Sequence, residues 1–192
     1  MVGFTGFGRR RAADPRLPPG QYLESGFPVL SAGPTPNIKR WELQVGTDAG
    51  QRSFSWDEFL ALPQESIETD IHCVTSWTKL GTQWRGVSLD TLFEGIETSQ
   101  PYLMATSYGG YTTNIPMSEV LGGKAWVAHE YDGKPLSADH GGPARLFVPG
   151  LYFWKSAKWV QGLQTMATDR RGFWESMGYH NHGDPWREER YA

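Results

Sequence analysis

The alternation of apolar and polar positions predicts a chain of short strands. The clearest case runs from residue 67 to 73, with Ile67, Thr69, Ile71 and Cys73 on one side and Glu68, Asp70 and His72 on the other. A period of two is typical of a strand with one face toward a core. The same kind of pattern predicts further strands over residues 41–45, 102–107, 111–115, 125–131, 144–148 and 159–166.

Short helices are predicted between these strands. Ser55 and Glu58 have the spacing of a capping box, and Pro63 ends the helix that they begin. A second helix is predicted over residues 88–94 and a helical turn over residues 116–121. Because helices and strands do not alternate as βαβ units, we predict an α+β fold with mixed or antiparallel β-sheets and short helices.

The N-terminal part of the chain is predicted to lack regular structure. Residues 1–26 are expected to form a flexible arm, ahead of one domain over residues 27–192. Three prolines exclude a helix from residues 27–36, where an extended segment across the body is expected. Arg9-Arg10-Arg11 is not followed by the apolar stretch of an export signal, so a cytoplasmic location is predicted.

Composition narrows the classes of protein that the chain can represent. Aromatic residues make up 14% of the sequence, enough for a sizeable core. The net charge of -3, from 18 basic and 21 acidic residues, gives no reason to expect binding to nucleic acid or to an anionic membrane. No apolar run approaches the roughly 20 residues that span a bilayer, so no membrane span is expected.

Candidate chemistry is concentrated in three polar clusters. Cys73 is the only cysteine and follows His72; it could be a metal ligand, a nucleophile or a small core residue. The other clusters are residues 139–145 and 155–159. In these, Arg145 offers a planar fork of donors for a phosphate, Lys158 adds a point charge, and small residues let backbone N–H groups approach a ligand. Together they are typical of an anion clamp, although each charge alone could be an ordinary surface charge.

The chain from Phe27 to its C-terminus resembles the molybdopterin-binding domain of the sulfite oxidase family, above all its compact, haem-free bacterial branch. The resemblance rests on five stretches: Phe27–Ser31, Ile71–Val74, His140–Arg145, Trp154–Trp159 and Gly178–Trp186. It implies a molybdenum-dependent oxidoreductase that moves one oxygen atom to or from a small substrate.

The resemblance also implies roles for particular residues. Cys73 corresponds to the thiolate that ligates molybdenum, and a soft thiolate suits a metal held by pterin sulfurs. The expected contacts with the pterin cofactor and its phosphate come from His140, Arg145, Lys158, the backbone of Ser156 and Ala157, and the hydroxyl of Ser107 or its neighbour Thr106. By proximity and charge, five residues are expected as candidates for the substrate mouth, although each could instead belong to a surface salt bridge: His72, Lys79, Arg85, Tyr108 and Lys155.

Two departures shape the expected partners. The sequence has no CxxCH motif for a c-type haem, so no haem is expected and electrons must pass through a separate partner, such as a flavin or iron–sulfur reductase. Residues 74–79 lack the arginine-bearing pattern of true sulfite oxidases. The expected substrate is therefore a sulfite-like oxyanion, a sulfoxide or an N-oxide.

Three other functions stay open. His180 and His182, with Cys73, His129 and His140, could bind zinc, although structural zinc sites usually show tight pairs of ligands. Cys73 could instead be the nucleophile of a hydrolase. The chain could also be a non-catalytic cofactor-binding or protein-interaction module on the same fold.

Overall fold

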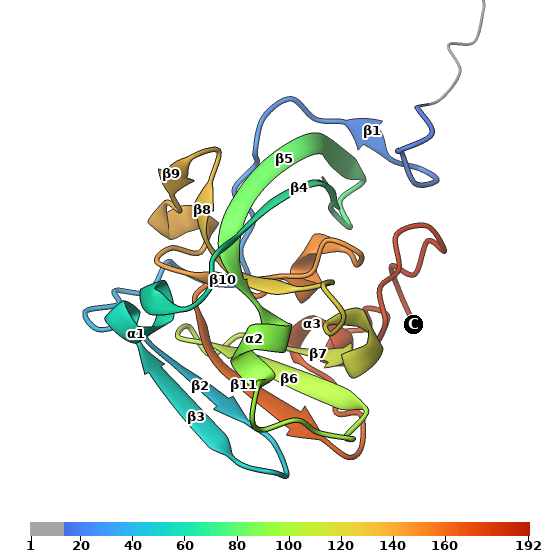
Figure 1. Ribbon diagram of the computed structural model, residues 1–192. Helices are drawn as coiled ribbons and strands as arrows, with labels where there is room; N and C mark the ends of the chain where they lie inside the picture. The colour runs from blue at the N-terminus through green and yellow to red at the C-terminus, as the bar shows by residue number, and fades with distance from the viewer. Residues whose placement is uncertain (1–13) are drawn as a thin grey trace, which may run out of the picture.

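The computed structural model describes residues 14–192, in which two mixed β-sheets and a few short helices form the body (Figure 1). The first sheet has the order β1-β5-β8-β10, with β4 added beside β5 and β9 beside β8. Its strands are β1 (Tyr22–Leu23), β4 (Glu65–His72), β5 (Trp77–Ser88), β8 (Trp126–Tyr131), β9 (Lys134–Pro135) and β10 (Arg145–Phe147).

The second sheet has the order β3-β2-β11-β6-β7. Its strands are β2 (Glu42–Gly46), β3 (Gln51–Ser55), β6 (Tyr102–Ser107), β7 (Thr112–Pro116) and β11 (Val160–Met166). The β1–β5 and β2–β11 pairs are parallel and the other pairs are antiparallel. The mixed sheets of the predicted α+β fold are therefore confirmed.

The short helices begin where their caps predict. Helix α1 (Trp56–Ala61) starts after Ser55, whose side chain accepts from the Glu58 backbone N–H while the Glu58 carboxylate accepts from the Ser55 N–H at 2.8 Å. Helix α2 (Leu89–Phe93) has a simpler cap, in which the Ser88 side chain accepts from the Thr91 N–H. The remaining helical elements are η1 (Met117–Glu119), η2 (Ala138–His140), η3 (Phe153–Lys155) and α3 (Phe173–Ser176). None of the helices in residues 14–192 is both long and apolar enough to cross a bilayer.

The core consists of two clusters of buried apolar side chains. The larger cluster includes Leu43, Leu103 and Leu163 of the second sheet and the inner face of α2. The smaller cluster lies under the curved β4–β5 pair and includes Cys73, Trp84 and Phe147. Cys73 is therefore at the edge of a packed core, with 7% of its surface exposed.

Part of the predicted arm lies against this body. Residues 1–13 fall outside the described residues, and the flexibility of the arm stays a prediction. Within residues 14–26, Tyr22 and Leu23 form β1, which pairs with Trp77 and Thr78 at the start of β5. The extended segment expected after Phe27 carries no helix, and it runs along the wall of a cavity described below.

Candidate active site

A cavity of about 350 Å³ brings together residues from distant parts of the chain. Five of the residues proposed from sequence line it, namely Cys73, His140, Arg145, Ser156 and Lys158. They come from the turn after β4, from the end of η2, from the start of β10, and from the segment between η3 and β11. Residues 27–34 and a group of aromatic side chains complete the wall.

Cys73 is held in a tight turn between β4 and β5. Its backbone N–H donates to Trp77 O at 2.8 Å, and Ser76 N–H donates back to Cys73 O at 3.0 Å. The thiol sulfur lies 3.2 Å from Thr75 Oγ1. Burial raises the pKa of the Cys73 thiol, so formation of the thiolate depends on a partner that compensates for its charge. A bound metal cation is a partner of that kind.

Arg145 brings a buried positive charge to the cavity. Its side chain is 1% exposed; Nη1 donates to His140 O at 2.8 Å and Nη2 to Ser156 O at 2.6 Å. Among the described residues, Nε has no hydrogen-bond partner and no carboxylate pairs with the guanidinium. Burial lowers the pKa of Arg145 to about 9, so the group stays charged at neutral pH. A buried cation without a counterion is costly, and an anion in the cavity would offset that cost.

Two further basic groups lie beside Arg145. Lys158 donates to Asp139 O at 2.5 Å, and burial together with the charge of Arg145 lowers the pKa of Lys158 to about 8. The His140 ring stacks on Phe27 with centroids 3.9 Å apart. No Asp or Glu lines this cavity in the described part of the chain. The cavity therefore has a positive potential that favours an anionic ligand.

Close backbone approach supports this cluster at Gly141. Its φ is +106°, a conformation that glycine adopts without strain, and a Cβ there would lie 3.1 Å from both Lys158 Cα and Arg145 Cβ. The motif His140–Arg145 thus needs glycine at this position so that the two basic residues can lie side by side.

Three of the proposed cofactor contacts do not line the cavity. Ser107 is buried with no partner for Oγ among the described residues, whereas Thr106 Oγ1 donates to Gly162 O at 3.4 Å within the sheet. The Ala157 carbonyl accepts from Leu146 N–H at 2.9 Å, which ties Ala157 into the core. Any contact of these residues with a cofactor stays a prediction.

The residues expected at the substrate mouth also lie outside the lining, each for a local reason. His72 is the last residue of β4, and its buried side chain is engaged by Thr78, with Nδ1 2.8 Å from Thr78 Oγ1. The Tyr108 hydroxyl accepts from Glu42 N–H at 2.6 Å and donates to Glu42 O at 3.0 Å. Lys79 donates to Ser25 O, so its side chain is also engaged elsewhere. Arg85 likewise lies outside the lining, on the middle of β5.

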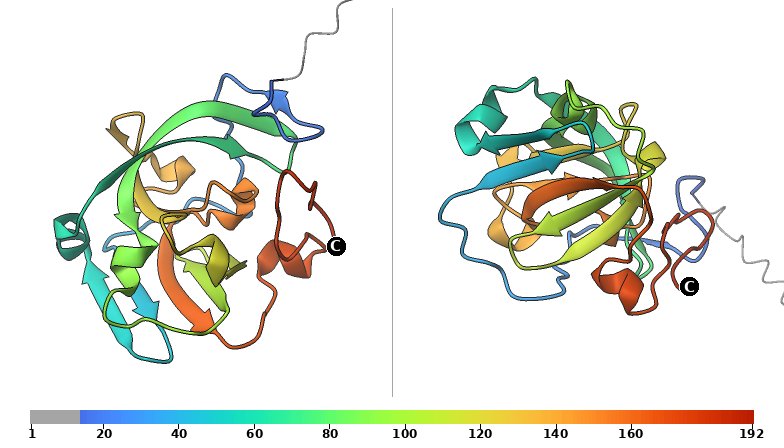
Figure 2. Two further views of the ribbon diagram at one scale, coloured as in Figure 1. Left: turned by 45° about the vertical axis from the view of Figure 1, so that its right-hand side comes forward. Right: turned by 90° about the horizontal axis from the view of Figure 1, so that it is seen from below.

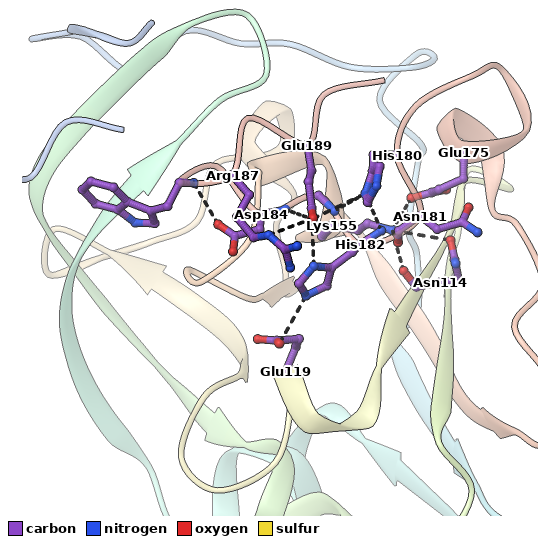
Figure 3. A network of polar contacts seen from close by, with 12 residues as sticks. Asn114, Glu119, Lys155, Glu175, His180, Asn181, His182, Asp184, Arg187 and Glu189 are labelled. Carbon is purple, nitrogen blue, oxygen red and sulfur yellow. Dashed lines mark hydrogen bonds and ion pairs between the residues drawn. The ribbon is translucent and has the colours of Figure 1, made fainter. Parts of the chain in front are cut away.

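Lys155 is fully buried in an ion pair. Its Nζ lies 2.7 Å from Glu175 Oε1 and donates to Asn114 O at 2.7 Å and Asn181 O at 2.6 Å (Figure 3). Glu175 Oε1 also accepts from the indole N–H of Trp154, a cavity residue, at 2.9 Å. The pair therefore joins β7, η3, α3 and the C-terminal segment behind the cavity wall. This network explains why a lysine is buried at position 155.

We expect Lys155→Met to destabilise the protein by about 3–5 kcal/mol, because Glu175 would keep a buried charge without its cation. Urea unfolding of the single variant and of Lys155→Met/Glu175→Gln would measure this loss. The double variant should regain part of the stability. A single variant within about 1 kcal/mol of wild type would contradict a structural role for the pair.

Sequence reasoning missed most of the aromatic wall. Trp174 stacks on Tyr179 at 5.0 Å, Trp154 meets Tyr179 edge-on at 5.1 Å, and the Tyr111 hydroxyl donates to Trp154 O at 2.7 Å. Phe173 packs against Trp174 at 5.1 Å. These residues are separated by up to 68 positions in sequence, and although Trp154 and Tyr179 lie in stretches that carry the resemblance, only aromatic richness could have pointed to Tyr111, Phe173 and Trp174.

The C-terminal histidines form acid–histidine contacts instead of a metal site. His182 Nδ1 lies 2.8 Å from Glu189 Oε2 and its Nε2 lies 3.2 Å from Glu119 Oε1, while His180 Nδ1 accepts from the His182 N–H at 3.1 Å (Figure 3). Over residues 14–192, no group of three or more His, Cys, Asp or Glu is placed to hold a metal ion. The zinc alternative thus has no support in these residues. The hydrolase has none either, because Cys73 makes its side-chain contact with Thr75 and not with a histidine.

Comparison with known proteins decides the family. The model of the oxidoreductase molybdopterin-binding domain matches residues 32–174, which contain every residue proposed from sequence for the cofactor. The chain belongs to this family. As a molybdopterin-binding oxidoreductase, it is an enzyme of the sulfite oxidase type.

Relatives of this molybdopterin-binding oxidoreductase range from near full-length matches to parts of longer proteins. The uncharacterized oxidoreductase YuiH of Bacillus subtilis is 38% identical over 97% of this chain and 98% of its own length. The putative protein-methionine-sulfoxide reductase subunit YedZ1 of Azospira oryzae is 30% identical over 70% of this chain and 52% of its own. Mitochondrial sulfite oxidase of Drosophila melanogaster is 26% identical over 82% of this chain and 32% of its own.

A solved structure shares the fold of this oxidoreductase. The sulfane dehydrogenase SoxCD of Paracoccus pantotrophus superposes with a TM-score of 0.59 at 21% identity, over 67% of this chain and 38% of that chain. The similarity shows the sulfite oxidase-type fold that the sequence predicted.

Proposed function

We propose that the protein transfers an oxygen atom to or from a small substrate at a Mo-molybdopterin centre ligated by Cys73. One observation carries the proposal: the only thiol of the chain and a buried guanidinium that has no counterion among residues 14–192 line the same cavity. A thiolate suits the metal, and the guanidinium suits the phosphate of the pterin.

The residues of the cavity fit this group. Within the part of the chain that the structure describes, the Nε of Arg145 lacks a partner. Lys158 and His140 lie beside it, and Gly141 lets the backbone approach closely. When bound, the cofactor supplies a metal that cycles between oxidation levels two electrons apart and exchanges one oxygen atom. Arg145, Lys158 and His140 would hold its anionic part, and Cys73 would give its thiolate to the metal.

The walls would keep bulk water from the reacting centre. The Phe27 ring covers His140, and Trp154, Trp174 and Tyr179 form a continuous aromatic surface. An apolar surround strengthens the attraction between a buried cation and an anion, because the local dielectric is low. It also favours small substrates over charged polymers.

The substrate is proposed to be a sulfite-like oxyanion, a sulfoxide or an N-oxide. Relatives named as sulfite oxidases and as a methionine-sulfoxide reductase subunit support this range. We propose a separate electron partner of the flavin or iron–sulfur type, no haem in this chain, and a cytoplasmic location.

A panel of substrates tests the proposal. Protein purified from a host that makes molybdopterin would be assayed with a reduced dye plus sulfoxides or N-oxides, and with sulfite plus an oxidised dye. Oxidation or reduction of one of these substrates that is lost in Cys73→Ser would support the proposed activity. If a molybdenum-loaded protein turns over none of these substrates, the non-catalytic cofactor-binding module on the same fold becomes the better reading.

A further inference from the structure

The turn that carries Cys73 is held by side chains from both ends of the chain. From the N-terminal side, Gln21 Nε2 donates to Cys73 O at 3.1 Å. From the C-terminal side, Arg190 Nη1 donates to Val74 O. These residues are 52 and 116 positions away from the carbonyls they bind, so neither contact follows from local sequence.

The two holding segments also meet each other. A Cβ at Gly20 would lie 3.4 Å from Glu188 Oε1 and 3.7 Å from Arg190 Nη2. Figures 1 and 2 show β1 and the C-terminal segment on the same side of the molecule, near the turn that joins β4 to β5. Gln21 and Arg190 thus approach the Cys73 turn from neighbouring directions.

Each of the two residues is itself fixed. The amide of Gln21 accepts from Thr78 Oγ1 at 3.4 Å, and the following residue, Tyr22, donates its N–H to Ser76 O at 2.9 Å. The backbone carbonyl of Arg190 accepts from His180 N–H at 3.2 Å, and its guanidinium lies 5.0 Å from the centre of the Tyr152 ring.

Arg190 also connects the turn to the aromatic wall. The segment around it folds back on residues 178–180, where Tyr179 pairs with Tyr191 and Ala192 N–H donates to Gly178 O at 3.0 Å. Tyr179 lines the cavity. A contact from Arg190 to Val74 O therefore fixes the spacing between the Cys73 turn and that wall.

The turn needs such support because it lies outside the sheet ladder. Ser76 has a φ of +75°, which a residue with a side chain adopts only when its surroundings hold it there. Without Gln21 and Arg190, the carbonyls of Cys73 and Val74 lose their long-range side-chain partners, and the turn keeps only its local hydrogen bonds and the bond from Tyr22 N–H to Ser76 O.

We propose that Gln21 and Arg190 are positioning residues, a clasp that fixes the Cys73 turn against the cavity before any metal binds. One part of this proposal rests on the proposed function, namely that the clasp serves to present the Cys73 thiolate to the metal in one orientation. Pre-organisation of this kind removes an ordering cost from ligand binding.

Hydrogen exchange in cofactor-free protein tests the clasp directly. Gln21→Met and Arg190→Met keep much of the side-chain volume and remove the donors. We expect the amides of Cys73 and Ser76, whose hydrogen bonds close the turn, to exchange about tenfold faster or more, because the local opening free energy of the turn falls. The core strands β2 and β11 should keep their wild-type rates, whereas a general loss of stability would accelerate them as well.

Arg187→Met is the matched control, since Arg187 belongs to the same segment, is 70% exposed and pairs only with Glu189 among the described residues. If Arg190→Met and Gln21→Met leave the amides of Cys73 and Ser76 at the exchange rates of Arg187→Met, the clasp is overturned. Should Arg190→Met fail to fold, Gln21→Met alone decides the question. The measurement uses no molybdenum, so its result is independent of whether the proposed function holds.

In loaded protein, the clasp predicts a change at the metal and not only in activity. The absorption band that arises from the Cys73 thiolate should shift or broaden in Arg190→Met and stay unchanged in Arg187→Met. An unchanged band with wild-type turnover would count against the clasp.

Discussion

Cys73→Ser is expected to abolish turnover and leave the fold intact. A serine oxygen is a harder and weaker ligand than a thiolate for a metal held by pterin sulfurs. The loss of activity should exceed the roughly 10–100-fold that follows removal of groups which only support a ligand. Because Thr75 Oγ1 lies within reach of position 73, the new hydroxyl keeps a partner, and stability should change by about 1 kcal/mol or less.

Turnover and urea unfolding of the same preparation would check both halves of this expectation. Cys73→Ala serves as the companion variant, because it removes the ligand without adding a hydroxyl. If Cys73→Ser keeps wild-type turnover, the thiolate does not ligate the metal. If both variants unfold instead, Cys73 is a core residue and its role in the cavity is unproven.

Arg145→Met is expected to lose most of its bound pterin. The buried guanidinium has no counterion among the described residues, so an anionic cofactor would be its charge partner. Loss of one partner of such a pair costs about 2–5 kcal/mol, which corresponds to weaker binding by a factor of about 30 to several thousand. The pterin released by denaturation, measured per chain, would report the loss.

The stability of the cofactor-free form separates this role from a structural one. Removing an uncompensated buried charge relieves a desolvation cost, whereas the carbonyls of His140 and Ser156 lose a donor, so the two effects oppose each other. We therefore expect little net change in the unfolding of cofactor-free Arg145→Met. Arg52→Met, on β3 and away from the cavity, is the control. Equal pterin content in Arg145→Met and wild type would refute the anion clamp.

Sequence patterns correctly predicted those helices and strands whose defining residues lie close together in the chain. The capping box of Ser55 and Glu58 marked α1, and alternation marked β4, β6 and β8. Strand β5 was missed although it is the longest, because it buries the polar side chains of Thr78 and Thr82. Thr82 donates to Thr69 O of β4 at 2.6 Å and Thr78 Oγ1 lies 2.8 Å from His72 Nδ1 of the same strand, and that compensation is invisible in a pattern of apolar positions.

The candidate site was predicted where a motif keeps its residues close in sequence. Cys73, His140, Arg145, Ser156 and Lys158 all reach the cavity. The residues expected at the substrate mouth from their proximity in sequence do not line the cavity, because other parts of the fold engage their side chains, and their role stays a prediction. Lys155 illustrates a further limit: whether a lysine faces a substrate or a buried carboxylate depends on Glu175, 20 residues later in the chain.

The contacts that residues near the two ends of the chain make with the Cys73 turn could not be predicted from the sequence either. Gln21 and Arg190 carry no motif, and their targets are backbone carbonyls that any residue would offer. The aromatic wall likewise depends on how β7, η3 and α3 pack. Such features follow from the tertiary fold and not from the spacing of residue types.

The central claim is that this cavity holds a molybdopterin cofactor through Cys73 and Arg145. Molybdenum and pterin content per chain, determined together on protein purified from a host that makes molybdopterin, tests it most directly. The account predicts close to one molybdenum and one pterin per chain, with the thiolate absorption band lost in Cys73→Ser. Protein from the same host that contains neither molybdenum nor pterin would contradict it.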